Sequence, residues 1–230
     1  MSNVYIISAP SGSGKSTLVE KVRKIVPGLD FSISYTTRQP RGNERNGIEY
    51  FFVSRDEFDQ MIRRGEFLEY AEVFGNCYGT AKRFLERAQQ EGHDLLLDID
   101  VQGAAQIKRK LPQAVSIFIL PPDRKTLESR LRNRSLDKED VIQRRLVTAS
   151  REIEKYRDYD YILINDRLED SVEALKAILL AERLRRAGVQ QSADDAETLA
   201  KAERCRLGNL GERLQPILAS FAATATPGGR

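Results

Sequence analysis

The sequence predicts an α/β domain in which helices cover both faces of a mostly parallel β-sheet, and three observations support this. Continuous apolar runs at residues 4–7, 94–100, 114–120 and 161–165 alternate with segments of helical periodicity. Strands of this kind are typical of parallel sheets that are buried between helices. A glycine-rich turn follows the first run and leads into a helical pattern over 15–26. A length of 230 residues suits one such domain with small inserted lobes.

The segment at residues 31–81 has a different pattern, which predicts a separate β-rich lobe. Strand-like stretches at 31–37, 49–53 and 67–74 surround a short helical pattern at 55–64, and glycines and asparagines mark the turns. Such an insertion in an α/β chain is expected to fold as a small lobe of its own.

Residues 82–186 contain the remaining predicted helices, and the periodicity of apolar residues becomes weak after residue 187. The expected helices lie at 82–90, 102–110, 124–132, 138–156 and 169–185, with a turn at 135–137. We therefore expect one domain over residues 1–186. From 187 to 230 the polar and glycine-containing segments predict a poorly ordered C-terminal extension with one helix over 200–214.

Composition and charge argue against several functions. The 37 Lys and Arg residues nearly balance the 34 Asp and Glu residues, so the net charge of +3 predicts no nucleic-acid partner. The longest apolar runs are too short to cross a membrane, and no secretory signal is visible, which predicts a cytoplasmic protein. One histidine, His93, and two distant cysteines, Cys77 and Cys205, argue against Ser-His-Asp catalysis, a histidine zinc site and a disulfide framework.

Residues 9–16 carry a phosphate-binding motif. They read Ala-Pro-Ser-Gly-Ser-Gly-Lys-Ser, which matches G-x-x-x-x-G-K-[ST] except at the first position, where alanine replaces glycine. Glycines let backbone N–H groups curl around phosphate oxygens, and the helix that follows directs its positive end at them. The alternative is a plain turn between strand and helix. The expected ATP-binding residues of this loop are Ala9, Pro10, Ser11, Gly12, Ser13, Gly14, Lys15, Ser16 and Thr17.

Two side chains of the motif have expected roles in catalysis. Lys15 can reach the transferred phosphate, and the Ser16 hydroxyl can bind Mg²⁺. The motif therefore predicts a site for a nucleoside triphosphate, but it does not identify the acceptor.

Further stretches closely resemble the guanylate kinase family, in the right order and without a gap from about residue 4 to 185. They are Ser-Tyr-Thr-Thr-Arg-Gln-Pro-Arg-Gly-Asn-Glu at 34–44, Asn-Gly-Ile-Glu-Tyr-Phe-Phe-Val at 46–53, Phe-Leu-Glu at 67–69, Tyr-Gly-Thr at 78–80, Asp-Ile-Asp-Val-Gln-Gly at 98–103, Ile-Phe-Ile-Leu-Pro-Pro at 117–122 and Arg-Leu-Arg-Asn-Arg at 130–134 with Arg144 and Arg145. The resemblance implies a P-loop core, a GMP-binding lobe at about 31–81 and a helical lid at about 123–156. It also implies transfer of the γ-phosphate of ATP to GMP and dGMP, with Mg²⁺, in purine nucleotide metabolism. A homo-oligomer is left open.

The residues of the lobe suit GMP at both of its ends. Arginines and phenolic hydroxyls match a doubly charged phosphate, and carboxylates match the N1–H and N2 donors of guanine, with hydroxyls on its O6 side. Adenine would place an acceptor against a carboxylate. The expected set is Arg38, Arg41, Tyr50 and Tyr78 for the phosphate and Ser34, Glu69, Thr80 and Asp100 for the base. The alternatives are solvated arginines, packing tyrosines, a glutamate facing water and a threonine that caps a helix.

The resemblance also implies residues on the ATP side. Asp98 would act near Mg²⁺, Arg134 and Arg145 of the lid would meet the transferred phosphoryl group, and Asn165 would lie at the adenine ring. No general base is needed, because the attacking phosphate oxygen is already deprotonated. Two rival functions are an inactive guanylate-kinase-like module that binds phosphopeptides and a kinase of the same fold that acts on a phosphorylated sugar.

Overall fold

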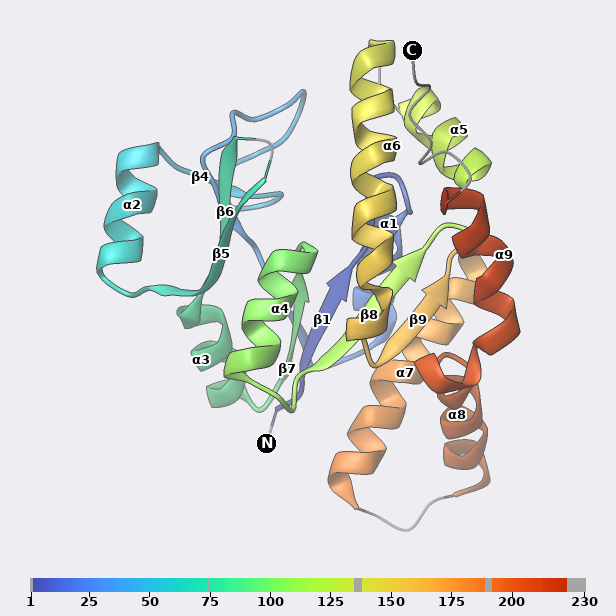
Figure 1. The fold of residues 1–230 in the computed structure, drawn as a ribbon. Helices are drawn as coiled ribbons and strands as arrows, with labels where there is room; N and C mark the ends of the chain where they lie inside the picture. Colours follow the sequence, from blue (N-terminus) through green and yellow to red (C-terminus); the bar gives the residue numbers. More distant parts are fainter. Residues whose placement is uncertain (1, 74, 135–137, 189–191, 223–230) are drawn as a thin grey trace. The chain divides into compact units, whose positions relative to one another are not determined.

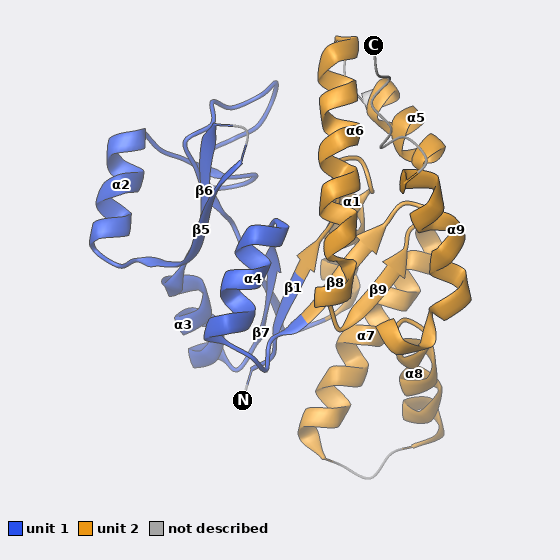
Figure 2. Cartoon of the chain, viewed as in Figure 1, with its two compact units in different colours: residues 1–6, 27–115 blue, residues 7–26, 116–230 orange. Residues whose placement is uncertain are grey.

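The computed structural model describes residues 2–73, 75–134, 138–188 and 192–222 (Figure 1). By its internal contacts the chain divides into two units (Figure 2). Unit 1 comprises Met1–Ile6 and Pro27–Val115, and unit 2 comprises Ile7–Val26 and Ser116–Arg230.

The main β-sheet has five strands among the described residues. In hydrogen-bonded order they are β2 (Leu29–Ser32), β7 (Asp94–Asp98), β1 (Val4–Ser8), β8 (Val115–Leu120) and β9 (Tyr161–Ile164). The pairings of β2 with β7 and of β8 with β9 are parallel. Every residue of β1 and β8 is buried, which explains their continuous apolar sequences. The predicted α/β class with a parallel sheet is confirmed.

Unit 1 also contains a second sheet, in the order β4, β3, β6, β5. These strands are β3 (Tyr35–Thr36), β4 (Phe51–Phe52), β5 (Phe67–Val73) and β6 (Asn76–Ala81). The strand predicted at 31–37 is wrong as a single element: residues 29–32 belong to the main sheet, and only 35–36 join the second one. The chain changes sheets between these two segments.

Helix α2 (Arg55–Arg63) covers the second sheet and closes a small core. The Ser54 side chain caps the helix by accepting a hydrogen bond from the Glu57 backbone. The core is formed by Tyr35, Phe58, Met61, Phe67, Cys77 and Ala81. Cys77 is therefore a packing residue. Two further helices of unit 1, α3 (Lys82–Glu91) and α4 (Val101–Lys110), precede and follow strand β7.

Unit 2 carries the helices that accompany β8, β9 and the end of β1. They are α1 (Lys15–Ile25), α5 (Arg124–Arg134), α6 (Glu139–Ile153), the short 3₁₀ helix η1 (Glu154–Asp158) and α7 (Leu168–Ala187). Helices α1 and α7 pack against each other. The predicted turn at 135–137 and the last residue of the strand predicted at 67–74 lie outside the described residues.

The C-terminal extension differs from its sequence-based expectation in its helices: the single helix predicted over 200–214 is wrong, because this range covers the end of one helix, a 3₁₀ turn and the start of another. These elements are α8 (Ala193–Glu203), the 3₁₀ turn η2 (Leu207–Asn209) and α9 (Gly211–Ala222). A capping box at Ser192 starts α8, which lies beside α7 (Figure 1). Leu214, Ile217 and Phe221 are buried along one face of α9. The Ser220 hydroxyl accepts a hydrogen bond of 3.1 Å from the Arg124 backbone at the start of α5.

This packing predicts that the extension contributes to stability. Phe221 is 4% exposed, so Phe221→Ala should lower the free energy of unfolding by about 3 kcal/mol and the melting temperature by roughly 6–12 °C. Thermal unfolding followed by circular dichroism measures the shift. The matched control is Gln215→Ala, an exposed position of the same helix. Equal melting temperatures for the two variants would show that α9 does not pack as described.

Candidate nucleotide and phosphate sites

The predicted phosphate loop has the backbone conformation that its glycines permit. Gly12 and Gly14 have φ of 92° and 86°, a region that residues with a side chain rarely adopt. Ser13 N donates to Pro10 O at 3.1 Å, and helix α1 starts directly after Gly14. The N–H groups of the loop and of the first turn of α1 therefore provide the donors that an anion needs.

The Asn165 side chain forms a hydrogen bond to the backbone of this loop. Its Nδ2 donates to Ser13 O at 2.7 Å, and its side chain is 5% exposed. A Cβ on Gly14 would lie 2.3 Å from the same nitrogen, so glycine is required there for two reasons. The resemblance implies an adenine contact for Asn165, and this contact stays a prediction. The structure adds a loop-positioning hydrogen bond that the sequence did not predict.

Arg130 of α5 is a further cation at the loop that the predicted site lacks. Its Nη2 donates to Asn165 O at 3.0 Å. Its Nη1 is buried and has no hydrogen-bond partner among the described residues. A buried guanidinium nitrogen without a partner is costly unless an acceptor binds there. Arg130 is therefore a candidate phosphate ligand beside Asn165.

The other lid arginines differ in their availability. Arg132 forms ion pairs with Glu139 at 2.6 Å and Glu128 at 2.7 Å, and its hydrogen bonds lower the pKa of Glu139 to about 2. The Arg132 guanidinium is therefore already paired with two carboxylates. Arg145 is half-buried on α6. Arg134 ends α5, and its side chain lies outside the part of the chain that the structure describes.

In unit 1, Arg38 is buried and oriented by Glu44. Nη2 of Arg38 lies 2.9 Å from both carboxylate oxygens of Glu44. Burial opposes its charge, but the hydrogen bonds and charge of Glu44 raise the pKa of Arg38 above its usual value. Glu44 also accepts from the Arg41 backbone at 2.8 Å. Glu44 thus joins both predicted arginines, a role that the sequence did not predict.

Two predicted tyrosines lie beside Arg38. The Tyr50 and Tyr78 rings meet edge to face with centroids 5.9 Å apart, and the Arg38 guanidinium lies 5.2 Å from the Tyr50 centroid. Arg41 is exposed. The alternative of a solvated arginine is wrong for Arg38, which is buried, and stays open for Arg41.

Glu69 is a buried carboxylate at the edge of the second sheet. It is 4% exposed, and its Oε1 accepts from Thr80 Oγ1 at 2.6 Å. Burial raises the pKa of the Glu69 carboxyl to about 7; the Thr80 hydrogen bond opposes this rise, and the Asp100 charge adds to it. The alternatives of a solvated Glu69 and a helix-capping Thr80 are both wrong, since Ala81 is the N-cap residue of α3. The Thr80 hydroxyl proton is directed at Glu69, so it is not offered to an acceptor such as O6.

Asp100 uses one carboxylate oxygen and leaves the other available. Oδ1 caps helix α4 by accepting from the backbones of Gln102 at 2.9 Å and Gly103 at 2.8 Å. Oδ2 is buried and has no hydrogen-bond partner within the described residues. An acceptor oxygen of this kind suits a ligand donor.

The remaining predicted residues are half-buried or exposed in the structure, and their roles stay predictions. Ser34 is half-buried between β2 and β3, and its backbone oxygen accepts from Phe51 N at 2.9 Å. Ser16 and Thr17 are exposed on the first turn of α1, and Asp98 is half-buried at the end of β7. Mg²⁺ binds oxygen ligands, so a hydroxyl at Ser16 and a carboxylate at Asp98 are each of a suitable donor type; their joint binding of the ion stays a prediction.

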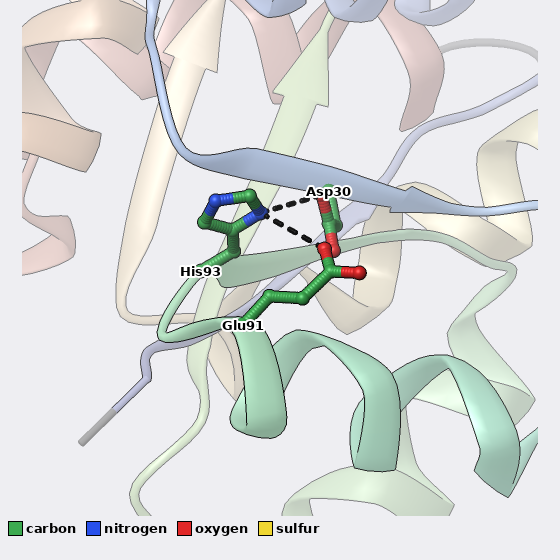
Figure 3. A group of neighbouring side chains, drawn as sticks. All are labelled: Asp30, Glu91 and His93. Atoms are coloured by element: carbon green, nitrogen blue, oxygen red, sulfur yellow. Dashed lines mark hydrogen bonds and ion pairs between the residues drawn. The ribbon is translucent and has the colours of Figure 1, made fainter.

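His93 belongs to a separate group with Asp30 and Glu91 in unit 1 (Figure 3). Its Nδ1 lies 3.1 Å from Asp30 Oδ1 and 3.4 Å from Glu91 Oε2. Glu91 Oε1 also accepts from Arg87 Nε at 2.9 Å. Hydrogen bonds and ion pairs account for this arrangement.

The loop geometry and the α/β core define a P-loop nucleotide-binding protein. A family model described as guanylate kinase matches residues 1–182. A guanylate kinase of Koribacter versatilis is 59% identical over 227 residues, which cover 97% of either chain, and one of Escherichia coli K12 is 50% identical over 83% of this chain and 93% of its own. The crystal structure of guanylate kinase from Anaplasma phagocytophilum matches with a TM-score of 0.68 and 35% identity, over 80% of this chain and 87% of that one. The chain belongs to the guanylate kinase family.

These matches also delimit the C-terminal extension. The family model ends at residue 182, whereas the Koribacter versatilis relative aligns over 97% of this chain. Within the described residues, none of the helices combines the length and apolar character that crossing a bilayer would demand.

Proposed function

We propose that this chain transfers the γ-phosphate of ATP to GMP and dGMP, giving ADP and GDP or dGDP, in the purine nucleotide metabolism of the cytoplasm. Family membership supports the reaction. The single structural observation that carries the choice of acceptor is the pair of carboxylates in unit 1, Glu69 and Asp100. Glu69 is 4% exposed, and Oδ2 of Asp100 is buried without a hydrogen-bond partner among the described residues. Carboxylate acceptors of this kind suit a base edge with two N–H groups.

Guanine is read by these carboxylates. N1–H and the N2 amino group donate to Glu69 and Asp100, and Ser34 lies on the O6 side. Thr80 orients Glu69 through their 2.6 Å hydrogen bond. Adenine has an acceptor at N1 and no amino group at C2, so it would leave these buried oxygens unpaired. Discrimination of roughly 10⁴-fold is expected for such a site.

The GMP phosphate is held by cations and phenols. Arg38 and Arg41 provide charge-assisted hydrogen bonds, and Tyr50 and Tyr78 add hydroxyl donors. The ion pair of 2.9 Å with Glu44 orients the Arg38 guanidinium, which reduces the entropy lost on binding.

On the donor side, the backbone of residues 9–17 binds the ATP phosphates and Lys15 reaches the transferred one. Ser16 and Asp98 would hold Mg²⁺, which when bound neutralises phosphate charge. Arg134 and Arg145 stabilise the charge that develops on the phosphoryl group, and closure of the lid excludes water. The acceptor is a phosphate oxygen, so no side chain has to remove a proton. Asn165 positions the loop and contacts the adenine end.

The experiment that tests this proposal is ADP formation from ATP-Mg²⁺ with GMP, dGMP, AMP or ribose 5-phosphate as acceptor. We expect rapid turnover with GMP, slower turnover with dGMP and little with AMP. Turnover of ribose 5-phosphate instead would favour a sugar-phosphate kinase. Absence of turnover together with phosphopeptide binding would favour an inactive binding module.

Arg41 gives a further prediction about the GMP phosphate. Arg41→Met should raise the KM for GMP about 10- to 100-fold, because a charge-assisted hydrogen bond is lost, and change kcat by less than about threefold. Steady-state kinetics at saturating ATP measures both constants. Arg45→Met is the matched control, because Arg45 is an exposed arginine in the same segment. A fall in kcat at constant KM would contradict the role given to Arg41.

A further inference from the structure

Gly103 lies against the Glu69 carboxylate. A Cβ built on Gly103 would lie 2.4 Å from Glu69 Oε2 and 3.0 Å from Glu69 Cδ. Side-chain carbons do not approach a carboxylate oxygen so closely. Gly103 is the third residue of α4, inside a helix and without a positive φ, so backbone conformation does not require glycine there. Glycine is required there because the Glu69 carboxylate occupies the space of a Cβ.

Glu69 cannot move aside without losing its own contacts. Its Oε1 is fixed by the 2.6 Å hydrogen bond from Thr80, and its side chain is 4% exposed. A methyl group at position 103 would therefore displace the carboxylate and weaken or break this hydrogen bond. The neighbour is a buried, anchored group rather than the free end of a flexible side chain.

The same turn of α4 also holds the second carboxylate. Gly103 N donates to Asp100 Oδ1 at 2.8 Å. Gly103 thus binds Asp100 through its backbone, and because it has no side chain it leaves room for the Glu69 carboxylate. The N-terminal turn of a helix favours negative charge. The geometry brings two acceptors to one helix end, and Asp100 Oδ2 is left without a partner there.

We infer that Gly103 is a specificity-determining position that sets the spacing of the two carboxylates that read guanine. The inference rests on the proposed role of Glu69. Gly103 is a positioning residue, since it acts through Glu69 and not by contact with the reacting atoms. A side chain at this position moves Glu69 away from the base edge and leaves the phosphate sites untouched.

The test is steady-state kinetics of Gly103→Ala with GMP and ATP. We expect the KM for GMP to rise at least about tenfold, with kcat and the KM for ATP within about threefold of the parent chain. The matched control is Gly208→Ala, because a Cβ at Gly208 would meet no heavy atom of the described chain within 4 Å. This control should leave all three constants unchanged.

A double-mutant cycle with Glu69→Ala separates this inference from the proposed function. Glu69→Ala alone should raise the KM for GMP, and adding Gly103→Ala should raise it no further, because the displaced carboxylate is gone. If Gly103→Ala does not fold, the double variant should recover a soluble protein.

Four outcomes would contradict one or other of these roles. Failure of Glu69→Ala to change the KM for GMP would refute the proposed role of Glu69 itself. A normal KM for GMP in Gly103→Ala, with a raised one in Glu69→Ala, would overturn only the role of Gly103. An equally large effect of Gly103→Ala in both backgrounds, or a double variant that stays insoluble, would show that Gly103 does not act through Glu69.

Discussion

Replacing Lys15 by alanine should lower kcat for GMP phosphorylation about a thousandfold and leave the KM for GMP within about threefold. Lys15 begins α1 directly after the left-handed Gly14, at the helix end that binds phosphate. In the proposed reaction its ammonium group stabilises charge on the transferred phosphoryl group, and losing one such donor in a closed site commonly costs this much in rate. The residues that we propose to bind GMP belong to another part of the chain and are unchanged.

Single-turnover kinetics with saturating ATP-Mg²⁺ and GMP measure the Lys15 effect on the chemical step. Lys21→Ala is the matched control, because Lys21 is an exposed lysine of the same helix. A Lys15→Ala variant with normal kcat and a large increase in the KM for GMP would contradict the role assigned to the loop.

Glu69→Gln should weaken GMP binding and stabilise the fold. The carboxamide keeps the size of the side chain but replaces one acceptor with an NH₂ donor, which meets the N–H groups of guanine. We expect the KM for GMP to rise about 100-fold, as for the loss of a buried hydrogen bond to a charged group. Glu72→Gln, on the exposed side of the same strand, is the matched control.

The stability effect follows from the raised pKa of Glu69. The pKa of Glu69 is about 7 in the folded protein, above the usual 4.5, so the folded state favours the protonated carboxyl group. The contribution of this group to stability is fully present below pH 4.5 and is lost as pH rises through 7. Above pH 7 the buried charge opposes folding by up to about 3 kcal/mol. Urea unfolding at pH 8 should therefore show Glu69→Gln to be more stable than the parent chain, with a smaller difference at pH 5.

The same ionisation predicts a pH dependence of GMP binding. The KM for GMP should fall as pH rises from 6 to 8, because the ionised carboxylate has acceptors only, whereas the protonated one turns an O–H donor toward the site. The GMP phosphate also ionises in this range, and the slope of the Glu69→Gln variant measures that contribution. Equal slopes for both proteins would show that Glu69 does not titrate in the site.

Local sequence patterns were sufficient for the core strands and the phosphate loop. Strands β1, β7 and β8 are buried along their whole or nearly whole length, so their composition alone separates them from amphipathic helices. The loop motif combines glycine spacing with a strand before it and a helix after it. These features depend on neighbours in sequence.

Other features depend on residues that are distant in sequence and could not be predicted. Asn165 and Ser13 are 152 positions apart, and the need for glycine at position 103 arises from Glu69 on another element. The division of residues 29–36 between two sheets has no local signal, because the β pattern continues through the crossing. Helix α9 was not predicted as an element: the expected helix ended at residue 214, whereas Leu214, Ile217 and Phe221 are all buried along one face of α9.

The central claim is that Glu69 and Asp100 together read the donor edge of guanine. A crystal structure of the chain with bound GMP tests it most directly. We expect the carboxylate oxygens of Glu69 and Asp100 to lie about 2.7–3.2 Å from N1 and N2 of the base. A GMP base bound elsewhere, with both carboxylates directed away from it, would contradict the claim.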